Sequence, residues 1–594
     1  MNDINIIENS AKRYSNTIAV FDVKNNIKKT YAELFQEIYL CTISFLKMGI
    51  EHNDKICIFS ENNGNWFAVE QGIERAGGIS VLRGSKLSPN AELEYIYNNS
   101  DAVGLITDDI KIFEYFKVKI KNFYKRNKVL VFLKTFNNID EFDREILDYN
   151  GLLNYAKGES YSLPKLEEQD TAVIVYSSGT SGHVKGVMLS HYAIAYIGDA
   201  NQKRIKLKPN KKAFLINPLW HSGFFVNTLY LMSIGTTIIM LSKDTYLNAL
   251  KKYKPEYLEV VPKTFDTLYN SYFEIVDSYK PIKKFLFYKF LDYAIKYRYN
   301  NGIIKNKISG KFNTLDYIKA LFNCFILFIP DKIAKYLFLY PLRRFFVVNR
   351  PLLYTAGVAL DKQVEDFFNV IGIRTIQKYG LSESCAILTN QSEKHSKYYT
   401  VGKPHIGVEI KIIDLESGKE LPSYSRGIIL AKGPQIMNGY YNNSEATRNI
   451  FIDGFLNTGD IGFLDDDGYL TYVGRCKDII VLQNGENVDA IEIEAKCREI
   501  PYIKQIVLCG QDKIYLTAIV ILKENIEVSK ENILSDINNK NIERASFKQF
   551  EKIKNIFVLK SDEIKIEDFY TNTQKFKRYK FYETYKNQID ALYN

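Results

Sequence analysis

The sequence predicts an α/β protein with a large N-terminal domain and a small C-terminal α+β domain. At 594 residues the chain is too long for one hydrophobic core. Short apolar runs rich in β-branched residues alternate with helical patterns over the first 170 residues, as in sheets flanked by helices. Turn signals become frequent from Tyr399 onward, and about 120 residues follow Arg475. We therefore expect mixed sheets covered by helices in residues 1–474 and a second domain in residues 475–594.

The elements of the first part can be assigned from their patterns. Short continuous apolar runs indicate buried strands, and longer stretches with a period near 3.6 indicate helices. A β-branched run at Thr171–Tyr176 is followed directly by a loop of glycine, serine and threonine. The other predicted strands are Ile56–Phe59, Gly78–Leu82 and Val103–Thr107, and the predicted helices between them are Trp66–Ala76 and Ala91–Asn98.

Residues 271–350 differ from the rest in being rich in lysine, tyrosine and phenylalanine with helical spacing of the apolar positions. They predict either a helical hairpin inserted in the large domain or an amphipathic surface that rests on a membrane and admits a lipid. The longest apolar run, residues 320–330, is interrupted by Asn323 and followed by Asp331 and Lys332. It is about half as long as a bilayer span, so we expect no transmembrane helix.

Composition sets limits on the class of protein. The net charge of +10, from 79 basic and 69 acidic residues, is spread along the chain. It suits a solvated surface, anionic ligands such as nucleotides, or a membrane surface, and we expect no nucleic-acid partner. Seven scattered cysteines indicate reduced thiols, and the first residues lack the features of a signal peptide. We therefore expect a cytoplasmic protein.

The loop at residues 176–186, Tyr-Ser-Ser-Gly-Thr-Ser-Gly-His-Val-Lys-Gly, is the strongest local signal. Glycines let the backbone approach a ligand closely, and hydroxyl and N–H groups with Lys185 suit phosphate oxygens. The spacing differs from that of the P-loop, since no serine or threonine follows Lys185. A Gly/Ser/Thr loop alone could be an ordinary surface turn, but the preceding strand and the lysine favour a phosphate site.

Further short motifs follow in order along the chain. They are Pro218-Leu219-Trp220-His221, Val261-Pro262, Thr355-Ala356-Gly357-Val358-Ala359-Leu360, Tyr379-Gly380-Leu381-Ser382-Glu383-Ser384, Asn457-Thr458-Gly459-Asp460, Gly474-Arg475-Cys476-Lys477-Asp478, Asn484-Gly485-Glu486-Asn487-Val488 and Thr571-Asn572-Thr573-Gln574-Lys575-Phe576-Lys577-Arg578.

Together with the loop, this series resembles the motifs of the adenylate-forming (AMP-binding) superfamily, which includes acyl-CoA synthetases, luciferases and peptide-synthetase adenylation domains. The match covers nearly the whole chain in the correct order. The last motif resembles the form found in long-chain acyl-CoA synthetases. The chain departs from the family at Val184, where proline is usual, and at Ala356, where glycine is usual. The resemblance implies the adenylate-forming enzyme fold, with a mobile C-terminal domain.

The resemblance also implies a role for each motif. Glu383 would hold Mg²⁺, with Thr180 as a second candidate ligand, and Ser382 would contact the α-phosphate. Asp460 would accept hydrogen bonds from the ribose hydroxyls, and Tyr379 would stack on adenine. The complete implied ATP/AMP site is Ser177, Ser178, Gly179, Thr180, Ser181, Gly182, Lys185, Ala356, Gly357, Val358, Tyr379, Gly380, Asp460 and Arg475.

Lys575 is the implied catalytic cation, which would bridge the substrate carboxylate and the α-phosphate. Its basic neighbours also allow it to be part of a plain charge run. Lys477 is the implied hinge, or else an exposed turn lysine. Rotation there would present Gly485, Glu486 and Asn487 to the incoming thiol.

Trp220 and His221 are implied to gate the acyl pocket. A histidine beside a tryptophan is more often a packed or positioning group than a base, and adenylation needs no general base because the acid is already ionised. His221 is therefore expected to position the carboxylate or gate the pocket.

The expected reaction is activation of a fatty acid by ATP and Mg²⁺, followed by transfer to coenzyme A. The last motif, the lipid-compatible insertion and Arg83-Gly84, which resembles a segment of some long-chain enzymes, favour a long-chain acid. One alternative is a ligase that loads an acyl carrier protein, because both acceptors end in the same pantetheine thiol. Another is a degenerate acyl- or nucleotide-binding protein, supported by the departures at Val184, Ala356 and Val358.

Overall fold

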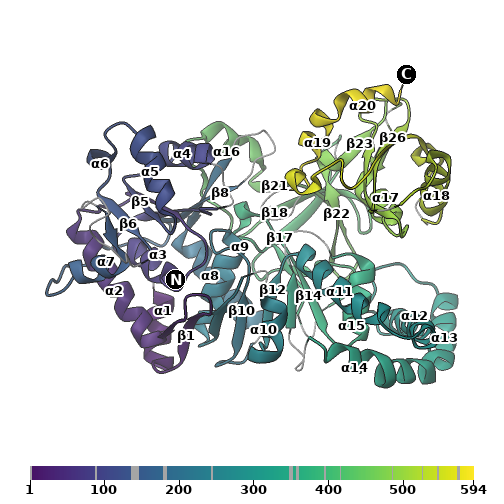
Figure 1. The fold of residues 1–594 in the computed structure, drawn as a ribbon, viewed down its shortest axis with the longest axis horizontal. Helices are drawn as coiled ribbons and strands as arrows, with labels where there is room; N and C mark the ends of the chain where they lie inside the picture. The colour runs from purple at the N-terminus through teal and green to yellow at the C-terminus, as the bar shows by residue number, and fades with distance from the viewer. Residues whose placement is uncertain are drawn as a thin grey trace. The chain divides into compact units, whose positions relative to one another are not determined.

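The structure is a computed structural model, and its fold is the mixed α/β fold that the sequence predicts (Figure 1). It describes residues 3, 5–86, 90–134, 146–177, 184–205, 207–242, 245–346, 352–355, 360–392, 396–414, 416–484, 486–524, 526–544, 547–570 and 576–593.

An eight-stranded sheet contains the strands predicted in the first part of the chain. The six strands β8, β4, β3, β5, β6 and β7 run parallel to one another. At the edge beside β8, the strands β9 and β19 pair antiparallel. In order, the strands are β19 (Gly439–Tyr440), β9 (Lys185–Ser190), β8 (Thr171–Ser177), β4 (Ile79–Arg83), β3 (Lys55–Phe59), β5 (Gly104–Thr107), β6 (Val129–Phe132) and β7 (Leu147–Asp148).

Both faces of this sheet are buried. Along β3, Ile56 and Ile58 belong to one hydrophobic cluster, whereas Cys57 and Phe59 belong to another. Side chains alternate between the two faces of a strand, so an apolar residue at every position requires helices on both sides. This explains why the strand reads as an uninterrupted apolar run.

The second large sheet has nine strands. Its central strands are parallel, and β2, β15 and β16 pair antiparallel at the ends. In order, the strands are β16 (Lys403–Pro404), β15 (Thr389–Asn390), β14 (Arg374–Tyr379), β13 (Leu352–Thr355), β12 (Tyr257–Val260), β10 (Lys212–Leu215), β11 (Thr237–Met240), β1 (Ile18–Asp22) and β2 (Ile27–Thr30).

Helices cover these sheets, and local sequence signals mark where several begin. The second helix starts at a capping box, in which the Thr30 hydroxyl accepts from the Glu33 N–H and the Glu33 carboxylate accepts from the Thr30 N–H. The helices are α1 (Asn5–Tyr14), α2 (Tyr31–Lys47), α3 (Trp66–Arg75), α4 (Asn90–Asn99), α5 (Ile110–Lys119), α6 (Phe123–Arg126), α7 (Tyr149–Tyr155), α8 (His191–Ile205), α9 (Ser222–Ser233), α10 (Tyr246–Tyr253), α11 (Pro262–Asp277) and α15 (Lys362–Val370).

Residues 271–346 are helical almost throughout. The long helices α12 (Pro281–Ile304) and α13 (Thr314–Ile333) pack side by side, and the chain continues through a π-helical segment, Ala334–Leu339, into α14 (Tyr340–Arg343) (Figure 1). Pro330 lies within α13, where it cannot donate a backbone hydrogen bond. No helix in the described ranges is long and apolar enough to cross a membrane.

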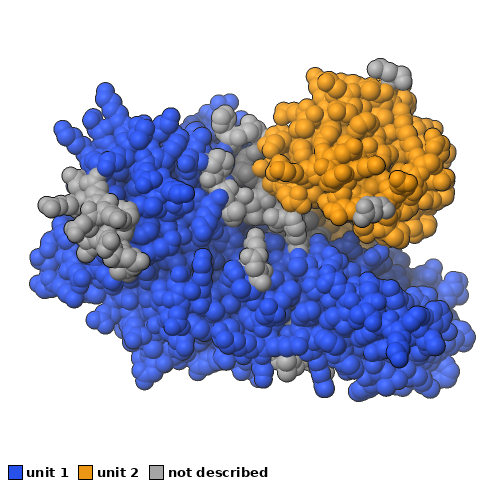
Figure 2. Space-filling model, in the orientation of Figure 1, with its two compact units in different colours: residues 1–410, 430–456, 465–470 blue, residues 411–429, 457–464, 471–594 orange. Residues whose placement is uncertain are grey.

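The chain divides into two compact units (Figure 2). The larger comprises residues 1–410, 430–456 and 465–470, and the smaller comprises residues 411–429, 457–464 and 471–594. A five-stranded sheet follows the order β17 (Glu409–Ile413), β18 (Gly427–Lys432), β21 (Phe455–Leu464) and β20 (Phe451–Ile452), with β22 (Leu470–Arg475) paired to β21. The C-terminal part contains β23 (Ile479–Val481), β24 (Asn487–Asp489), β25 (Ile503–Cys509), β26 (Leu516–Leu522), β27 (Ile553–Leu559), α17 (Ala490–Cys497), α18 (Lys530–Ile542), α19 (Arg578–Thr584) and α20 (Lys586–Ala591).

The C-terminal strands form the core of an α+β domain. The sheet β25–β26–β27 contributes Ile506, Val520 and Ile556, and the helices α17 and α18 contribute Ile493 and Ile533 to the same hydrophobic cluster. All seven cysteines of the chain are free thiols, as their scattered positions predict.

Candidate active site

The serine- and glycine-rich loop connects two antiparallel strands of the first sheet. Ser177 ends β8 and lies opposite Lys185, which begins β9. The predicted phosphate-binding residues Ser178, Gly179, Thr180, Ser181 and Gly182 lie outside the described residues. Val184, where the family usually has proline, is buried in the cluster under the sheet.

Gly186 is required by close packing on this hairpin. A Cβ atom at this position would lie 3.0 Å from the Tyr176 ring and 2.9 Å from the Ile174 side chain. The Tyr176 hydroxyl donates to Asn99 Oδ1 at 2.7 Å, so the ring is held against the glycine. The two ends of the loop are therefore fixed by the sheet.

Three side chains converge beside this hairpin: Lys185, Tyr440 and Glu383. The short strand β19 pairs with β9, so that Tyr440 lies opposite Val187. The Tyr440 hydroxyl donates to Glu383 Oε1 at 2.8 Å, and Lys185 Nζ lies 5.0 Å from the centre of the Tyr440 ring. The structure thus joins the predicted phosphate lysine and the predicted metal ligand through a tyrosine that sequence reasoning missed.

The backbone around Glu383 has an unusual conformation. Ser382, Glu383 and Ser384 form one turn of 3₁₀-helix, and Cys385 and Ala386 follow with φ of 49° and 73°. A Cβ atom on Gly380 would lie 2.3 Å from the Ala386 carbonyl oxygen. Positive φ at two consecutive non-glycine residues is costly and is typical of functional sites. This tight turn presents Glu383 and Ser382, both half-buried, at the end of β14.

Tyr440 and Glu383 are also connected through the main chain. The Met437 N–H donates to the Glu383 carbonyl oxygen at 2.9 Å, and the Tyr441 N–H donates to the Gly186 carbonyl oxygen at 2.8 Å. Burial first, and the neighbouring Glu383 carboxylate second, raise the pKa of Tyr440 above its usual value. Tyr440 therefore remains a neutral donor to the carboxylate.

Tyr379, the predicted adenine-stacking residue, is the buried last residue of β14. The Ala356, Gly357 and Val358 segment lies outside the described residues. The residues on either side of that segment are anchored, because Thr355 ends β13 and the Leu360 N–H donates to Gln377 Oε1 at 3.0 Å.

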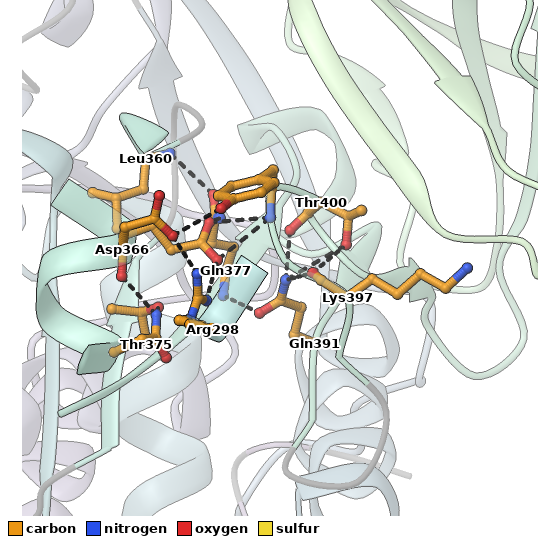
Figure 3. Close-up of polar contacts among 11 residues, drawn as sticks. Arg298, Leu360, Asp366, Thr375, Gln377, Gln391, Lys397 and Thr400 are labelled. Carbon is orange, nitrogen blue, oxygen red and sulfur yellow. Dashed lines mark hydrogen bonds and ion pairs between the residues drawn. The ribbon is translucent and has the colours of Figure 1, made fainter. Parts of the chain in front are cut away.

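A buried polar network supports this part of the site (Figure 3). Arg298 of α12 forms ion pairs with Glu365 and Asp366 of α15. Gln377 of β14 donates to Glu365 Oε2 at 2.8 Å, and the Tyr399 hydroxyl donates to Asp366 Oδ1 at 2.8 Å. The network fixes the strand that leads directly to Tyr379, and it ties the helical insertion to that strand.

The predicted gate residues Trp220 and His221 lie at the start of α9. Gly84 packs so tightly against Trp220 that a Cβ atom there would lie 2.5 Å from Trp220 Nε1. The guanidinium of Arg83 lies 5.2 Å from the Trp220 ring centre and donates to the Tyr176 carbonyl oxygen at 2.9 Å. His221 caps the helix, its Nδ1 accepting from the Gly223 N–H at 3.3 Å. Arg83-Gly84 therefore connects the tryptophan to the strand that leads into the loop.

Asp460 and Arg475 belong to the smaller unit, where the structure brings them together. Arg475 Nε lies 3.4 Å from Asp460 Oδ1. Asp460 is buried, and its N–H donates to the Thr458 hydroxyl at 3.1 Å. Two motifs that are separated in sequence thus form one carboxylate–guanidinium pair, suited to polar hydroxyl and phosphate groups.

The predicted hinge and thiol-side loop are adjacent in the sequence of the smaller unit. Lys477 lies in a 3₁₀ turn, Cys476–Asp478, directly before β23. Glu486 is half-buried, and its N–H donates to Asn484 Oδ1 at 3.1 Å; Asn487 begins β24 and pairs with Val481. Gly485 lies outside the described residues.

Lys575 lies outside the described residues, but the chain just beyond it is anchored. Arg578 is buried and donates from Nη1 and Nη2 to the two carboxylate oxygens of Glu494 at 2.7 and 2.9 Å. Such a bidentate pair fixes a backbone more firmly than a solvated lysine does. Arg578 is therefore a structural residue of α19, and the basic stretch is not a plain charge run at that position.

The group of Lys185, Tyr440 and Glu383 suits the binding and activation of a nucleoside triphosphate. In the larger unit, Lys185 lies over the Tyr440 ring, and the half-buried Glu383 carboxylate accepts a hydrogen bond from the Tyr440 hydroxyl. The hydrogen bond from Tyr440 uses one of the two Glu383 carboxylate oxygens, and oxygen donors are what Mg²⁺ prefers.

Comparison with protein families gives a match over almost the whole chain. The AMP-binding enzyme model matches residues 7–441, and the AMP-binding enzyme C-terminal domain model matches residues 477–594. Among solved structures, ATP-bound MatB from Rhodopseudomonas palustris superimposes with a TM-score of 0.72, covering 99% of this chain and 100% of that chain at 20% identity. This likeness shows a shared fold.

Three curated relatives from Arabidopsis thaliana match over most of their length. Probable acyl-activating enzyme 16, chloroplastic, is 29% identical over 99% of this chain and 88% of its own. Long-chain-fatty-acid–[acyl-carrier-protein] ligase AEE15, chloroplastic, is 28% identical over 99% and 86%. Long chain acyl-CoA synthetase 4 is 26% identical over 95% and 87%. With both family models matched in order, the chain belongs to the AMP-binding enzyme family and is an acid-activating ligase of the adenylate-forming type.

Proposed function

We propose that the protein activates a long-chain fatty acid with ATP, forming an acyl-adenylate and pyrophosphate, and then transfers the acyl group to a pantetheine thiol. The observation that supports the proposal is that Tyr440 contacts both Lys185, the proposed phosphate-binding cation, and Glu383, the proposed Mg²⁺ ligand. The names of the relatives, which include long-chain fatty acid ligases, support the substrate class.

In the first step, an oxygen of the fatty acid carboxylate attacks the α-phosphorus. The bond to the β-phosphate oxygen breaks, and its electron pair leaves with pyrophosphate. Lys185 and the loop before it hold the departing phosphates, while Ser382 contacts the α-phosphate. Lys575 neutralises the charge that the two anions bring together. When bound at Glu383, Mg²⁺ supplies further neutralisation of the triphosphate.

In the second step, the thiol sulfur attacks the acyl carbon while its proton passes to solvent, and AMP leaves with the electron pair of the carbon–oxygen bond. The proposed rotation about Lys477 replaces Lys575 by the loop of Gly485, Glu486 and Asn487. Asp460 and Arg475 hold the ribose of the nucleotide through both steps.

We infer an acyl carrier protein as the favoured acceptor, with coenzyme A second. The sequence motifs do not separate the two, because both present pantetheine. The names of the relatives differ: the ligase at 28% identity acts on an acyl carrier protein, and the synthetase at 26% is an acyl-CoA synthetase. The carrier protein, which we treat as an alternative from sequence alone, therefore has the stronger support.

Product analysis tests this proposal. Purified protein is incubated with palmitate, ATP and Mg²⁺, with either holo acyl carrier protein or coenzyme A, and acyl-adenylate and thioesters are measured by mass spectrometry. Acyl-adenylate without acceptor, and faster thioester formation on the carrier protein, are expected. The Glu383→Gln variant is the control and should form neither product. A protein that binds palmitate and ATP but forms no adenylate would instead be the degenerate binding protein.

The insertion offers a way for the enzyme to meet its lipid substrate. One side of α13 exposes a row of large apolar side chains to solvent, a patch that is rare on soluble proteins. Lys319 and Lys332 are exposed on the same helix. We propose that this face rests on an anionic lipid surface. Its exposed apolar residues are Leu315, Ile318, Leu321, Phe322, Phe325, Ile326, Phe328 and Ile329.

Vesicle sedimentation tests the membrane contact. The wild-type protein should bind phosphatidylglycerol-containing vesicles, and Phe325→Asp with Ile329→Asp should reduce binding at least tenfold. The matched control is Val118→Asp on α5, since Val118 and Phe325 are each 83% exposed. Equal binding by the double variant and the control would contradict the proposal.

The cellular location is a separate proposal. Two of the relatives have "chloroplastic" in their names, whereas we propose a cytoplasmic location for this chain.

A further inference from the structure

A second group of titratable side chains, which includes Asp3 near the N-terminal end of the chain, has no role in the proposed reaction. Asp3 precedes α1, Glu70 and Glu74 lie one turn apart on α3, and His191 begins α8 (Figure 1). The three carboxylates are 0% exposed, and His191 is 2% exposed. Two glutamates at this helical spacing repel one another, so their burial together calls for a compensating positive group.

The hydrogen bonds in this cluster satisfy only part of its oxygen atoms. His191 Nδ1 lies 2.6 Å from Asp3 Oδ1. The side-chain amide of Gln71 donates to Glu70 Oε2 at 3.0 Å and to Glu74 Oε2 at 3.1 Å. Four oxygen atoms of the cluster are buried without a hydrogen-bond partner among the described residues. They are Asp3 Oδ2, Glu70 Oε1, Gln71 Oε1 and Glu74 Oε1.

The charge of the cluster needs balancing. Three ionised carboxylates and one protonated imidazole leave two negative charges in a site shielded from water, which is strongly unfavourable. Protons can neutralise the site, because burial raises the pKa of Glu70 to about 7 and, with Glu70 and Asp3 nearby, raises that of Glu74 further. A divalent cation bound by the neutral imidazole offsets two of the three carboxylate charges and also occupies the unpartnered oxygens.

The geometry favours the cation. One donor atom each from Asp3, Glu74 and His191 lie within 4.8 Å of one another. Donors at about 2.1 Å from a tetrahedral centre lie about 3.4 Å apart, so the three side chains close in by up to about 1.4 Å when they bind the ion, a movement that rotation of the two carboxylates can supply. We propose that Asp3, Glu74 and His191 bind one divalent transition-metal ion. The mixed carboxylate and imidazole donors suit Zn²⁺.

The metal ion gives these residues a structural role. It links the segment before α1 to α3 and to the first residue of α8, which follows directly after β9 and Lys185. Gln71 donates to Glu74 Oε2, which leaves the unpartnered Oε1 as the proposed ligand atom and orients the carboxylate, as partners of metal ligands commonly do. The site stabilises the start of the chain against the strand–helix unit that carries the phosphate lysine, and it does not depend on the proposed activity.

Metal binding by the full-length protein tests the proposal. After removal of metal with a chelator, the protein is dialysed against Zn²⁺ without nucleotide, and bound zinc is measured by plasma mass spectrometry. One equivalent of zinc and a rise of several degrees in Tm are expected, because a ligand that binds only the folded state stabilises it. Glu74→Gln and His191→Gln should lose the zinc and the rise in Tm.

Two control variants separate this site from others. Glu167→Gln removes an exposed carboxylate by the same change, and Glu383→Gln removes the proposed nucleotide-site ligand; both should keep the zinc. Zinc below 0.2 equivalents in the wild type, or equal zinc in all variants, would overturn the proposal. If the cluster variants do not fold, Co²⁺ added to the wild type decides: the visible bands of four- or five-coordinate cobalt support the site, and the spectrum of aqueous cobalt contradicts it.

Discussion

Tyr440 is the residue on which the geometry of the proposed ATP site depends. Its hydroxyl donates to Glu383, and its ring lies against Lys185. Tyr440→Phe keeps the ring and removes the hydrogen bond, which for a charged acceptor is worth about 1.5–3 kcal/mol. The Mg²⁺ concentration for half-maximal adenylation should rise roughly tenfold. Tyr441→Phe is the matched control, and an unchanged Mg²⁺ requirement in Tyr440→Phe would contradict the role of Tyr440.

His405 makes stability sensitive to acid. Burial, followed by the nearby Arg204 and Lys378, lowers its pKa to about 3. Below about pH 6.5 the unfolded chain takes up a proton that the folded chain excludes, so stability falls until the pH reaches about 3. His405→Gln should lose about 1.6 kcal/mol less stability than the wild type between pH 6.5 and 5. Thermal unfolding at both pH values measures the difference, and parallel losses would count against it.

Individual site residues were predictable to different degrees. Lys185 and Glu383 each lie within a short, unbroken sequence motif, so their roles could be expected from the sequence. Those roles stay predictions. Tyr440 could not be expected, because its place depends on the pairing of a two-residue strand with β9, about 250 residues earlier. The buried cluster of Asp3, Glu74 and His191 likewise has no local pattern, since its members come from three separate elements.

At the scale of elements, Arg298 holds the helical insertion to the strand of the active site. It pairs with both Glu365 and Asp366 inside the protein (Figure 3). Arg298→Met would leave two buried carboxylates without their cation and should destabilise the protein by about 3–5 kcal/mol. Lys296→Met, which breaks an exposed pair on the same helix, should cost less than about 1 kcal/mol. Equal Tm values for the two variants would show that the network is dispensable.

The elements follow the sequence where local signals agree with packing. Strands β3, β4, β5 and β8 and helices α3 and α4 match the predicted ranges to within one or two residues, because long apolar runs and helical periods are strong signals. The very short strands β15, β16 and β19 have no such signal. The side of α13 that is exposed also could not be read from its sequence, because apolar residues occur nearly all around it.

At the scale of the whole molecule, we propose that the C-terminal domain rotates about Lys477. Lys477→Pro fixes φ at the proposed hinge and should slow thioester formation at least tenfold, while adenylation changes less than twofold. Lys477→Ala, which keeps backbone freedom, is the matched control. Measuring the two half-reactions separately tests the idea, and equal losses in both would argue for a purely structural turn.

The two-part organisation was predictable from length and from turn signals, and the family models match two separate segments. The smaller compact unit, however, also takes in residues 411–429 and 457–464, which precede the predicted boundary at residue 474. Turn residues mark hairpins without saying which unit each hairpin joins, so this assignment requires the tertiary contacts.

The central claim is acyl-adenylate formation, and fatty-acid-dependent exchange of labelled pyrophosphate into ATP tests it most directly. We expect exchange in the wild type that requires both palmitate and Mg²⁺, and its loss by at least a hundredfold in Lys575→Ala with ATP binding retained. Lys577→Ala, two residues away in the same basic stretch, should exchange normally. Absence of exchange in the wild type, or full exchange in Lys575→Ala, would contradict the account.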